Sequence, residues 1–202
     1  MTTRGNRQRT IEHRQAIEAA ILEAMAGLLQ QRAFRDVSVE DVMSATGLSR
    51  TAFYRYFPDL EAVMLRLMDD TEGRLSIAAG KWILAEDPRA ILVDVARELA
   101  EIYQSDGRII LAFADAAAGA TDLEAAWREA IAGFIDVVAA KVSDLRAAGL
   151  SAVDDPVEIS RALVWMTERY LLEVFGRQPG SVTTETAAKV LDTVWMRALF
   201  SS

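Results

Sequence analysis

A short stretch of the chain carries the side chains best suited to bind a nucleic acid. Arg50 and Arg55 can each bind a phosphate or the edge of a guanine base, and Tyr54 and Tyr56 can donate hydroxyl hydrogen bonds to phosphates. A helix over this stretch would present on its outer face Arg50, Thr51, Tyr54 and Arg55. The alternative is a tight helical corner in which the two tyrosines are half-buried.

The N-terminal segment adds further positive charge. Arg4, Arg7 and Arg9 lie in residues 1–10, which we expect to form a disordered basic arm able to follow the minor groove or the phosphate backbone. The net charge of the chain is −8, but residues 1–57 hold eight arginines against six acids, a balance of +2. Since −8 minus +2 leaves −10 for the other residues, only the first quarter of the chain suits a phosphate surface.

The sequence contains no arrangement typical of catalysis or metal binding. It has no cysteine and a single histidine, His13, which argues against disulfides, thiolate chemistry, a histidine metal site and a serine–histidine–acid triad. The acids lie at solvent-facing helix spacings or as adjacent pairs, and there is no glycine-rich phosphate loop. We therefore expect no enzymatic activity, no cofactor and no metal. The lack of a bilayer-spanning apolar run or a secretory signal predicts a cytoplasmic protein.

Helix signals surround the arginine and tyrosine stretch. Apolar residues at helical spacing predict a long helix over residues 11–31. Ser38 followed by Asp41 predicts a capping box that begins a short helix, and Gly47 predicts its left-handed end. Ser49 can cap a second short helix. Two short helices joined through a glycine turn, behind a longer helix, are typical of a helix-turn-helix.

Residues 36–59 read DVSVEDVMSATGLSRTAFYRYFPD, which resembles the signature of TetR-family transcriptional regulators. The resemblance implies a homodimer on a near-palindromic double-stranded DNA operator, usually a repressor that a small ligand releases. The positions that match family positions touching DNA are Ser38, Arg50, Thr51, Tyr54 and Tyr56, and we expect Ser49 and Arg55 at the same interface. The family usually has a lysine after the Pro-Asp pair. This chain has Leu60 there, so Arg55 or the arm arginines are the candidates to supply that phosphate contact.

The rest of the chain predicts further helices. A fourth helix should run from residue 59 or 60 to about Trp82. Turn signals divide the remaining residues into five more helices, at 88–105, 107–118, 122–148, 156–177 and 183–199. The expected fold is therefore all-α with about nine helices. We expect a helix-turn-helix domain over 1–58 and a helical ligand-binding and dimerisation domain over 59–202.

Three C-terminal segments are similar to the ethionamide-resistance repressor branch of the TetR family: 162–170 (ALVWMTERY), 178–179 (QP) and 190–193 (VLDT). That branch binds elongated hydrophobic molecules in a tunnel lined by two aromatics, which Trp127 and Phe134 resemble. It has a ligand-binding asparagine where this chain has Thr167, so the same ligands cannot be assumed. The residues expected to line a pocket for a small apolar effector are Phe113, Trp127, Phe134, Trp165, Met166, Thr167 and Tyr170. The alternative is that these side chains simply fill the core.

The last two predicted helices each carry a broad apolar stripe. Two such helices from each of two subunits can pack as a four-helix bundle. The residues expected at this dimer interface are Leu163, Val174, Val190, Leu191, Val194 and Ala198. The alternative that the stripes face the protein's own body stays open. A second class of function also stays open, a dimeric helical interaction scaffold that does not bind DNA.

Overall fold

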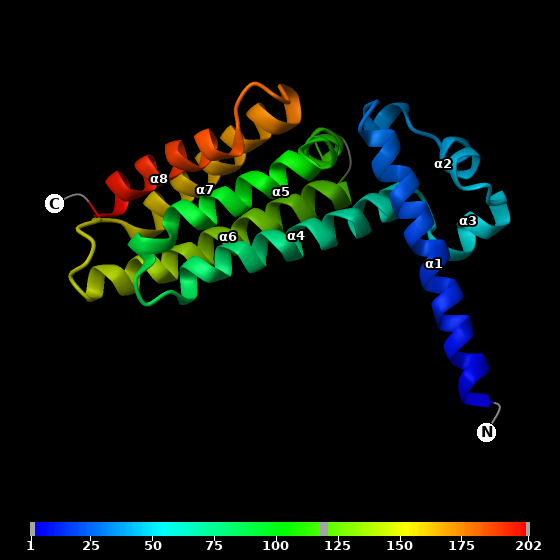
Figure 1. Ribbon diagram of the computed structural model, residues 1–202, viewed down its shortest axis with the longest axis horizontal. Helices are drawn as coiled ribbons and strands as arrows, with labels where there is room; N and C mark the ends of the chain where they lie inside the picture. The colour runs from blue at the N-terminus through cyan, green and yellow to red at the C-terminus, as the bar shows by residue number, and fades with distance from the viewer. Residues whose placement is uncertain (1–2, 118–120, 201–202) are drawn as a thin grey trace. The chain divides into compact units, whose positions relative to one another are not determined.

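The computed structural model describes the backbone of residues 3–117 and 121–200, and the side chains of residues 8–9, 11–117 and 122–200 (Figure 1). Within these ranges every regular element is helical, with eight α-helices, a short 3-10 helix and one π-helical segment. The chain divides into two compact units, Met1–Asp69 and Asp70–Ser202. Helix α4, Leu60–Leu84, crosses this boundary and contributes residues to both units.

The first unit contains α1 (Thr3–Leu29), η1 (Phe34–Asp36), α2 (Val39–Thr46), α3 (Arg50–Tyr56) and the start of α4. Ile21 and Met25, one turn apart on α1, are fully buried, as are Val42 of α2 and Phe53 of α3. Because α2 and α3 are too short to be stable alone, this shared core is what keeps them helical.

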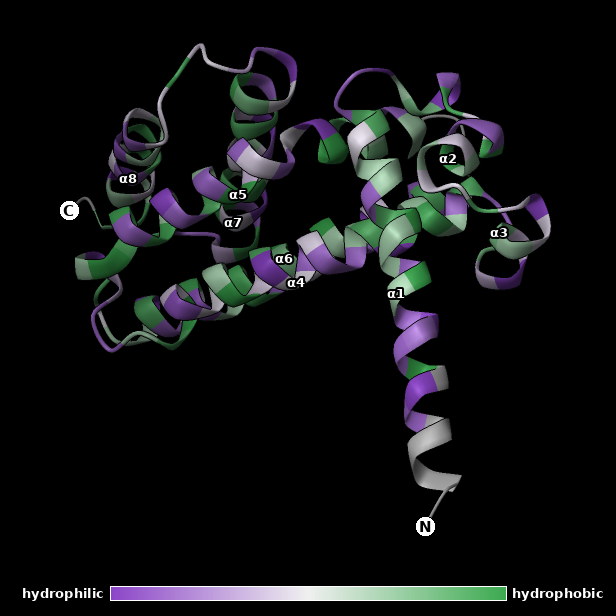
Figure 2. Ribbon diagram, turned by 45° about the vertical axis from the view of Figure 1, so that its right-hand side comes forward, coloured by the Kyte–Doolittle hydropathy of each residue, from purple (hydrophilic) through white to green (hydrophobic). Residues whose placement is uncertain are grey.

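Helix α1 begins earlier than its sequence pattern predicts. The pattern places the start at residue 11, after a disordered arm, whereas the structure is helical from Thr3. Gly5 and Asn6 have low helix propensity, but the arginines and Gln8 around them favour helix and no proline interrupts residues 3–10. Among the described side chains, residues 8, 9 and 11–16 of α1 are all exposed, and the coloured part of this helix before its buried residues is mainly hydrophilic (Figure 2).

The second unit contains the rest of α4, α5 (Pro88–Ala117), α6 (Thr121–Ala147), α7 (Pro156–Leu171), η2 (Leu172–Arg177) and α8 (Thr184–Phe200). Helix α5 contacts α6, α7, η2 and α8 and is therefore the central helix of this unit. A cluster of buried side chains at one end of it includes Trp82, Leu92, Val142 and Leu163. In the described part of the chain, no helix is both long and apolar enough to cross a membrane.

The prediction of nine helices is wrong by one. The sequence predicts a break at the Asp106-Gly107 pair, but α5 runs through it without interruption. Gly107 is there because another backbone lies against it: a Cβ at this position would be 2.9 Å from the carbonyl carbon of Phe175. Gly176 is the reciprocal case, since its Cβ would lie 2.8 Å from the Gly107 carbonyl oxygen. The two glycines therefore let α5 and the π-helical η2 approach each other backbone to backbone.

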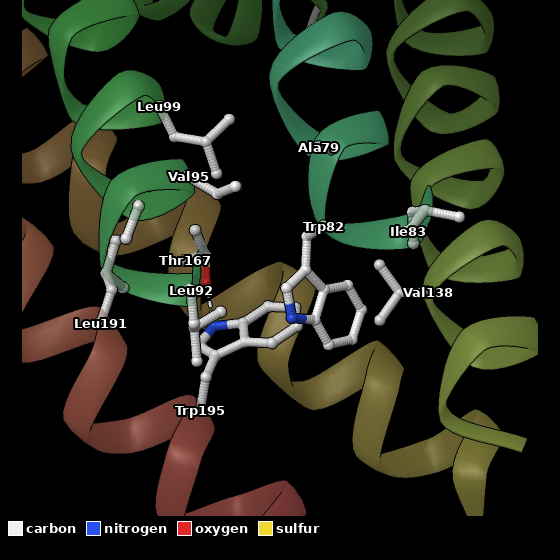
Figure 3. A pocket seen from close by; sticks show the side chains of 11 residues that line it. Ala79, Trp82, Ile83, Leu92, Val95, Leu99, Val138, Thr167, Leu191 and Trp195 are labelled. Carbon is white, nitrogen blue, oxygen red and sulfur yellow. Dashed lines mark hydrogen bonds between the residues drawn. The ribbon is translucent and has the colours of Figure 1, made fainter. Parts of the chain in front are cut away.

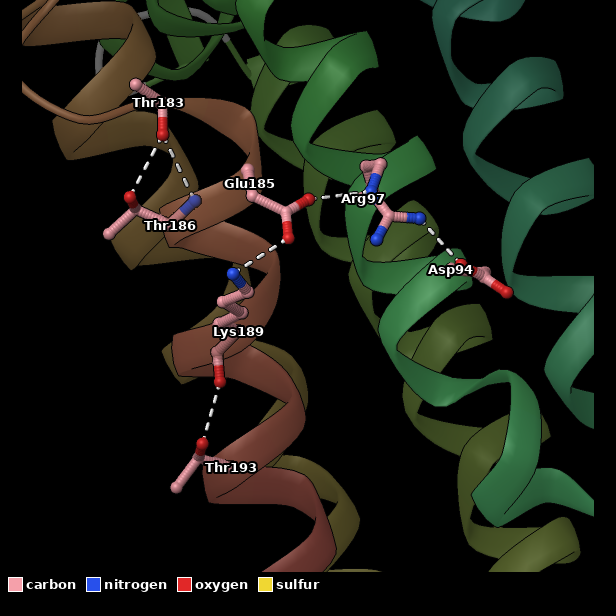
Figure 4. A network of polar contacts seen from close by, with 7 residues as sticks. All are labelled: Asp94, Arg97, Thr183, Glu185, Thr186, Lys189 and Thr193. Carbon is pink, nitrogen blue, oxygen red and sulfur yellow. Dashed lines mark hydrogen bonds and ion pairs between the residues drawn. The ribbon is translucent and has the colours of Figure 1, made fainter.

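A surface network joins α5 to α8 (Figure 4). Arg97 of α5 donates to Asp94 on its own helix at 2.6 Å and to Glu185 of α8 at 3.0 Å, and Lys189 lies 3.1 Å from Glu185. The bonds from Arg97 and Lys189 hold the pKa of Glu185 below its usual range. All four side chains reach solvent, so the network contributes little stability and mainly orients the two helices.

Candidate functional site

Two serine caps set the boundaries of α2 and α3. The Ser38 hydroxyl accepts from the backbone N–H of Asp41 at 3.2 Å, and the Asp41 carboxylate accepts from the backbone N–H of Ser38 at 2.9 Å, which completes the predicted capping box. Gly47 ends α2 with a φ of 70°, the left-handed conformation that favours glycine. The Ser49 hydroxyl then caps α3 by accepting from the backbone N–H of Ala52 at 3.2 Å.

The two capping serines differ in what they can still donate. The Ser38 hydroxyl also donates to the Asp41 carboxylate at 2.6 Å, and this bond, with the backbone one and a smaller contribution from Arg32, lowers the pKa of Asp41. The hydrogen of Ser38 is thus used within the protein. Ser49 only accepts among the hydrogen bonds of the described residues, so its hydroxyl hydrogen is available to an outside acceptor.

Helix α3 has one buried side and one exposed side. Phe53 is fully buried, whereas its neighbour Tyr54 is 46% exposed. Thr51 and Arg55 are also exposed, and Tyr56 is half-buried. The two aromatic rings at 53 and 54 meet edge to face with centroids 5.4 Å apart, which holds the Tyr54 ring at the edge of the core.

Arg50 begins this exposed side and is held by two neighbours. Its Nη1 lies 2.6 Å from Oε1 of Glu40 on α2, and its Nη2 lies 3.5 Å from the hydroxyl of Tyr54. Its guanidinium carbon also lies 5.7 Å from the centroid of the Tyr54 ring. The Tyr54 hydroxyl, followed by the Glu40 charge, raises the pKa of Arg50, so this group is a permanent cation on the surface of α3.

The remaining cations predicted to touch DNA are only partly described. Arg9 is exposed on α1, and the side chains of Arg4 and Arg7 lie outside the described residues. Leu60, which stands where the family usually has lysine, is half-buried at the first residue of α4. Asp59 precedes it and accepts from the backbone N–H of Ala62 at 2.8 Å, so the start of α4 has an acidic cap.

The second unit contains an apolar cavity of about 60 Å³ that is partly open to solvent (Figure 3). Trp82 of α4 and Trp195 of α8 meet across it edge to face, with ring centroids 5.6 Å apart. The Trp195 indole N–H donates to the Thr167 hydroxyl at 2.9 Å, and the Trp82 indole N–H donates to the Pro88 carbonyl at 3.1 Å. Within the described residues the Thr167 hydroxyl hydrogen has no acceptor, so it is the one polar donor that this lining offers.

Only one of the predicted pocket residues, Thr167, lines this cavity. Phe113 and Trp127 instead contact each other with ring centroids 5.9 Å apart, and these two residues stay a prediction together with Phe134, Met166 and Tyr170. Trp165, which is 42% exposed on α7 and does not line this cavity, also stays a prediction. The sequence did not single out the cavity's own wall, such as Val95, Leu99 and Val138, because these residues have the ordinary spacing of core positions.

The residues predicted for the dimer interface lie on two different faces of the last helices, one buried and one exposed. Leu163, Val174 and Leu191 are buried in their own chain, so their assignment to an interface is corrected. Leu163 belongs to the buried cluster around Trp82, and Leu191 lines the cavity. Val190 is 42% exposed, and Val194 and Ala198 are half-buried. The stripe failed as a guide because a helix packed on both sides is apolar around most of its circumference.

Comparison with known proteins identifies both parts of the chain. Residues 21–67 match the family of bacterial regulatory proteins, tetR family, and residues 93–201 match the C-terminal domain of the transcriptional regulator EthR. The HTH-type transcriptional regulator EthR of Mycobacterium tuberculosis is 31% identical over 196 residues, covering 91% of this chain and 87% of EthR. The regulator of the same name from Mycolicibacterium smegmatis is 24% identical over 188 residues, covering 92% and 87%.

Solved structures show the same fold. The TetR-family regulator PfmR of Thermus thermophilus superposes with a TM-score of 0.75 at 20% identity, covering 90% of this chain and 99% of PfmR. The regulator MbdR of Azoarcus sp. CIB gives a TM-score of 0.74 at 20% identity, covering 91% and 98%. With the family matches over both parts, the chain belongs to the TetR family of DNA-binding transcriptional regulators and carries an EthR-type C-terminal domain.

Proposed function

We propose that the exposed side of α3 reads the bases of an operator. The observation that carries the proposal is that, opposite the buried Phe53, this helix exposes Arg50, Thr51, Tyr54 and Arg55. A helix fits the major groove, which is about 12 Å wide, with its N-terminal side chains at the base edges. Ser49, Tyr56 and the cations of the N-terminal segment are then placed to bind phosphates. Ser38 contributes to this interface indirectly, because it caps the start of α2.

The second unit supplies the response to a ligand. In this proposal residues 1–58 bind DNA, and residues 59–202 bind both a small apolar effector and a second copy of the chain. Because a cavity of about 60 Å³ holds only a few waters or a small apolar group, a larger effector must move lining side chains such as Trp82 or Trp195. An effector that binds the rearranged state better shifts the population toward it and releases the operator.

The proposed dimer surface is the exposed side of α7 and α8. Trp165 and Val190 are both 42% exposed there, and large apolar groups on a surface are typical of an interaction site. A two-fold dimer presents two copies of α3, which predicts a near-palindromic operator with half-sites at least one DNA turn apart, roughly 34 Å. Two half-sites multiply the specificity that a single short helix can provide.

The experiment is a fluorescence-anisotropy titration of the intact protein with DNA from upstream of its own gene, against a scrambled sequence, at two salt concentrations. Wild type should prefer the upstream DNA and lose affinity as salt rises. Arg50→Ala should weaken binding by roughly tenfold or more and lower the salt slope by about one. Tyr54→Phe, which removes a single hydroxyl, should have a smaller effect in the same direction.

A matched control separates these contacts from the general loss of charge. Arg128→Ala on α6 removes an arginine whose side chain is 75% exposed, and it should leave the affinity unchanged. Equal affinities for the two sequences, or a loss with Arg128→Ala as large as with Arg50→Ala, would contradict the proposed reading surface.

A further inference from the structure

Two polar side chains of the second unit are almost completely buried without a partner. Tyr103 of α5 is 6% exposed and Glu168 of α7 is 7% exposed. In the described part of the chain no hydrogen bond or ion pair reaches either of them. Other buried polar groups there are satisfied: Ser160 donates to the Pro156 carbonyl at 2.6 Å and Thr71 to the Asp106 carboxylate at 2.9 Å. Glu168 and Tyr103 therefore differ from these buried groups in having no hydrogen-bond partner.

Their oxygen atoms are not fully enclosed and can be reached by at least a water molecule. Among the described side chains, no nitrogen or oxygen atom is both fully enclosed and without a hydrogen-bond partner. Since Tyr103 and Glu168 lack partners, their oxygens must face an opening, even though nearly all of each residue is covered. A buried carboxylate without a paired counter-charge costs free energy, so a ligand group that neutralises it gains correspondingly.

Both residues are close along the chain to residues that line the apolar cavity. Leu99, which lines the cavity, and Tyr103 are four residues apart on α5 and so occupy the same face, one helical turn from each other. On α7, Glu168 directly follows the cavity residue Thr167. Neither residue lines the cavity itself, so a ligand must extend beyond the apolar space along these two helices to reach their oxygens.

The electrostatics of the pair favour one kind of ligand group. Burial, and then the nearby charge of Glu168, raises the pKa of Tyr103, so the phenol stays protonated. Burial also raises the pKa of Glu168, against a smaller opposing effect of Arg169. Such a site disfavours an added negative charge. A protonated amine suits it, because one N–H can donate to the Glu168 carboxylate and another to the Tyr103 oxygen, which accepts through a lone pair.

We propose that Tyr103 and Glu168 bind the nitrogen end of the effector, whose apolar body occupies the cavity. This inference rests on the proposed function, because it presumes that the second unit binds an effector. It narrows the chemical class from an apolar molecule to an apolar molecule that ends in an amine.

The test uses a matched pair of probes on the intact protein. Calorimetric titration compares 2-phenylethylamine with propylbenzene, which has the same shape but no nitrogen. Wild type should bind the amine at least tenfold more tightly than the hydrocarbon. In Glu168→Gln that ratio should fall to about one, and in Tyr103→Phe it should fall by a few-fold. Both substitutions conserve shape, so each variant can be checked for an unchanged helical circular dichroism spectrum before titration.

The control is Glu158→Gln on the same helix. Glu158 is exposed and pairs with Arg161 at 3.2 Å, so its loss changes the net charge equally but lies outside the proposed site. The amine preference should persist in this variant. A wild type without amine preference, or a preference that survives Glu168→Gln, overturns the inference. If propylbenzene nevertheless binds and releases the upstream DNA, the proposed function stands; if neither probe binds, the inference is overturned, and the operator titration alone decides on the proposed function.

Discussion

Arg50 lies 2.6 Å from Glu40, so its guanidinium must exchange one anion for another when it meets a phosphate or base edge. Both side chains are more than half exposed, so the pair is weak and easily broken. It nevertheless points the guanidinium along the exposed side of α3, where Tyr54 supports it from the other direction. Glu40 therefore orients Arg50 toward DNA and also competes with DNA for its guanidinium.

Substitution of Glu40→Gln should strengthen operator binding. The variant removes the competing charge but keeps the length of the side chain and an acceptor oxygen. Because exposed ion pairs are worth about 0.2–1 kcal/mol, the affinity should rise by roughly two- to fivefold. The measurement is the anisotropy titration at low salt.

The control for this prediction is Glu23→Gln, an exposed glutamate on α1 of the same unit, whose side chain forms no ion pair among the described residues. It removes the same charge without releasing Arg50. Equal gains from both variants would mean that general repulsion of phosphate, rather than the Arg50 pair, limits binding.

At the scale of elements, the crossing of α5 and η2 is set by two glycines. The Cβ positions of Gly107 and Gly176 would each lie under 3.0 Å from a backbone atom of the other element. Backbone cannot move aside as a flexible side chain can, so both positions exclude any side chain. The π-helical geometry of η2 occurs at this same contact, and such turns are frequent at functional sites.

Gly107→Ala should therefore destabilise the protein although alanine favours helix. Forcing the two elements apart should cost about 1–3 kcal/mol, as other overpacking substitutions do. Gly133→Ala on α6 is the opposite case, since no atom lies within 4 Å of its Cβ position, and it should stabilise by about 0.5–1 kcal/mol. Urea unfolding of both variants gives the comparison, and a stabilising Gly107→Ala would refute the close contact.

The same crossing shows where prediction from sequence succeeds and fails. The capping box at Ser38 and the left-handed Gly47 are local signals, and they placed α2 and α3 correctly. Gly107 carries a local signal for a break, but its role depends on a segment almost seventy residues away. The cavity was missed for a similar reason: its wall comes from α4, α5, α6, α7 and α8, and each lining residue resembles an ordinary core position along its own helix.

For the whole molecule, the proposed two-fold assembly determines whether one short helix can specify an operator. The exposed apolar side of α7 and α8 is the proposed contact, but exposed apolar residues occur elsewhere too, including Val137 of α6, which is 50% exposed. Exposure alone therefore does not choose the interface. Three large apolar side chains, Val157, Trp165 and Val190, are exposed on α7 and α8, whereas Val137 is the only one exposed among the described residues of α6, and this difference favours α7 and α8.

Val190→Arg should convert the dimer into monomers. An unpaired charge buried in an interface typically costs about 2–5 kcal/mol, which raises the dissociation constant by roughly thirtyfold to a few thousandfold. Val137→Arg introduces the same charge on a different helix and should leave the dimer intact. Sedimentation velocity distinguishes the two, and the reverse outcome would move the interface to α6.

The edge-to-face pair of Trp82 and Trp195 has a practical consequence. Two of the four tryptophans of the chain flank the cavity, and indole fluorescence depends on the polarity and packing around the ring. An effector that enters must alter the surroundings of at least one of them. With Trp127 and Trp165 replaced by phenylalanine, the remaining emission would come from this pair, and the protein would report occupancy optically without any attached dye.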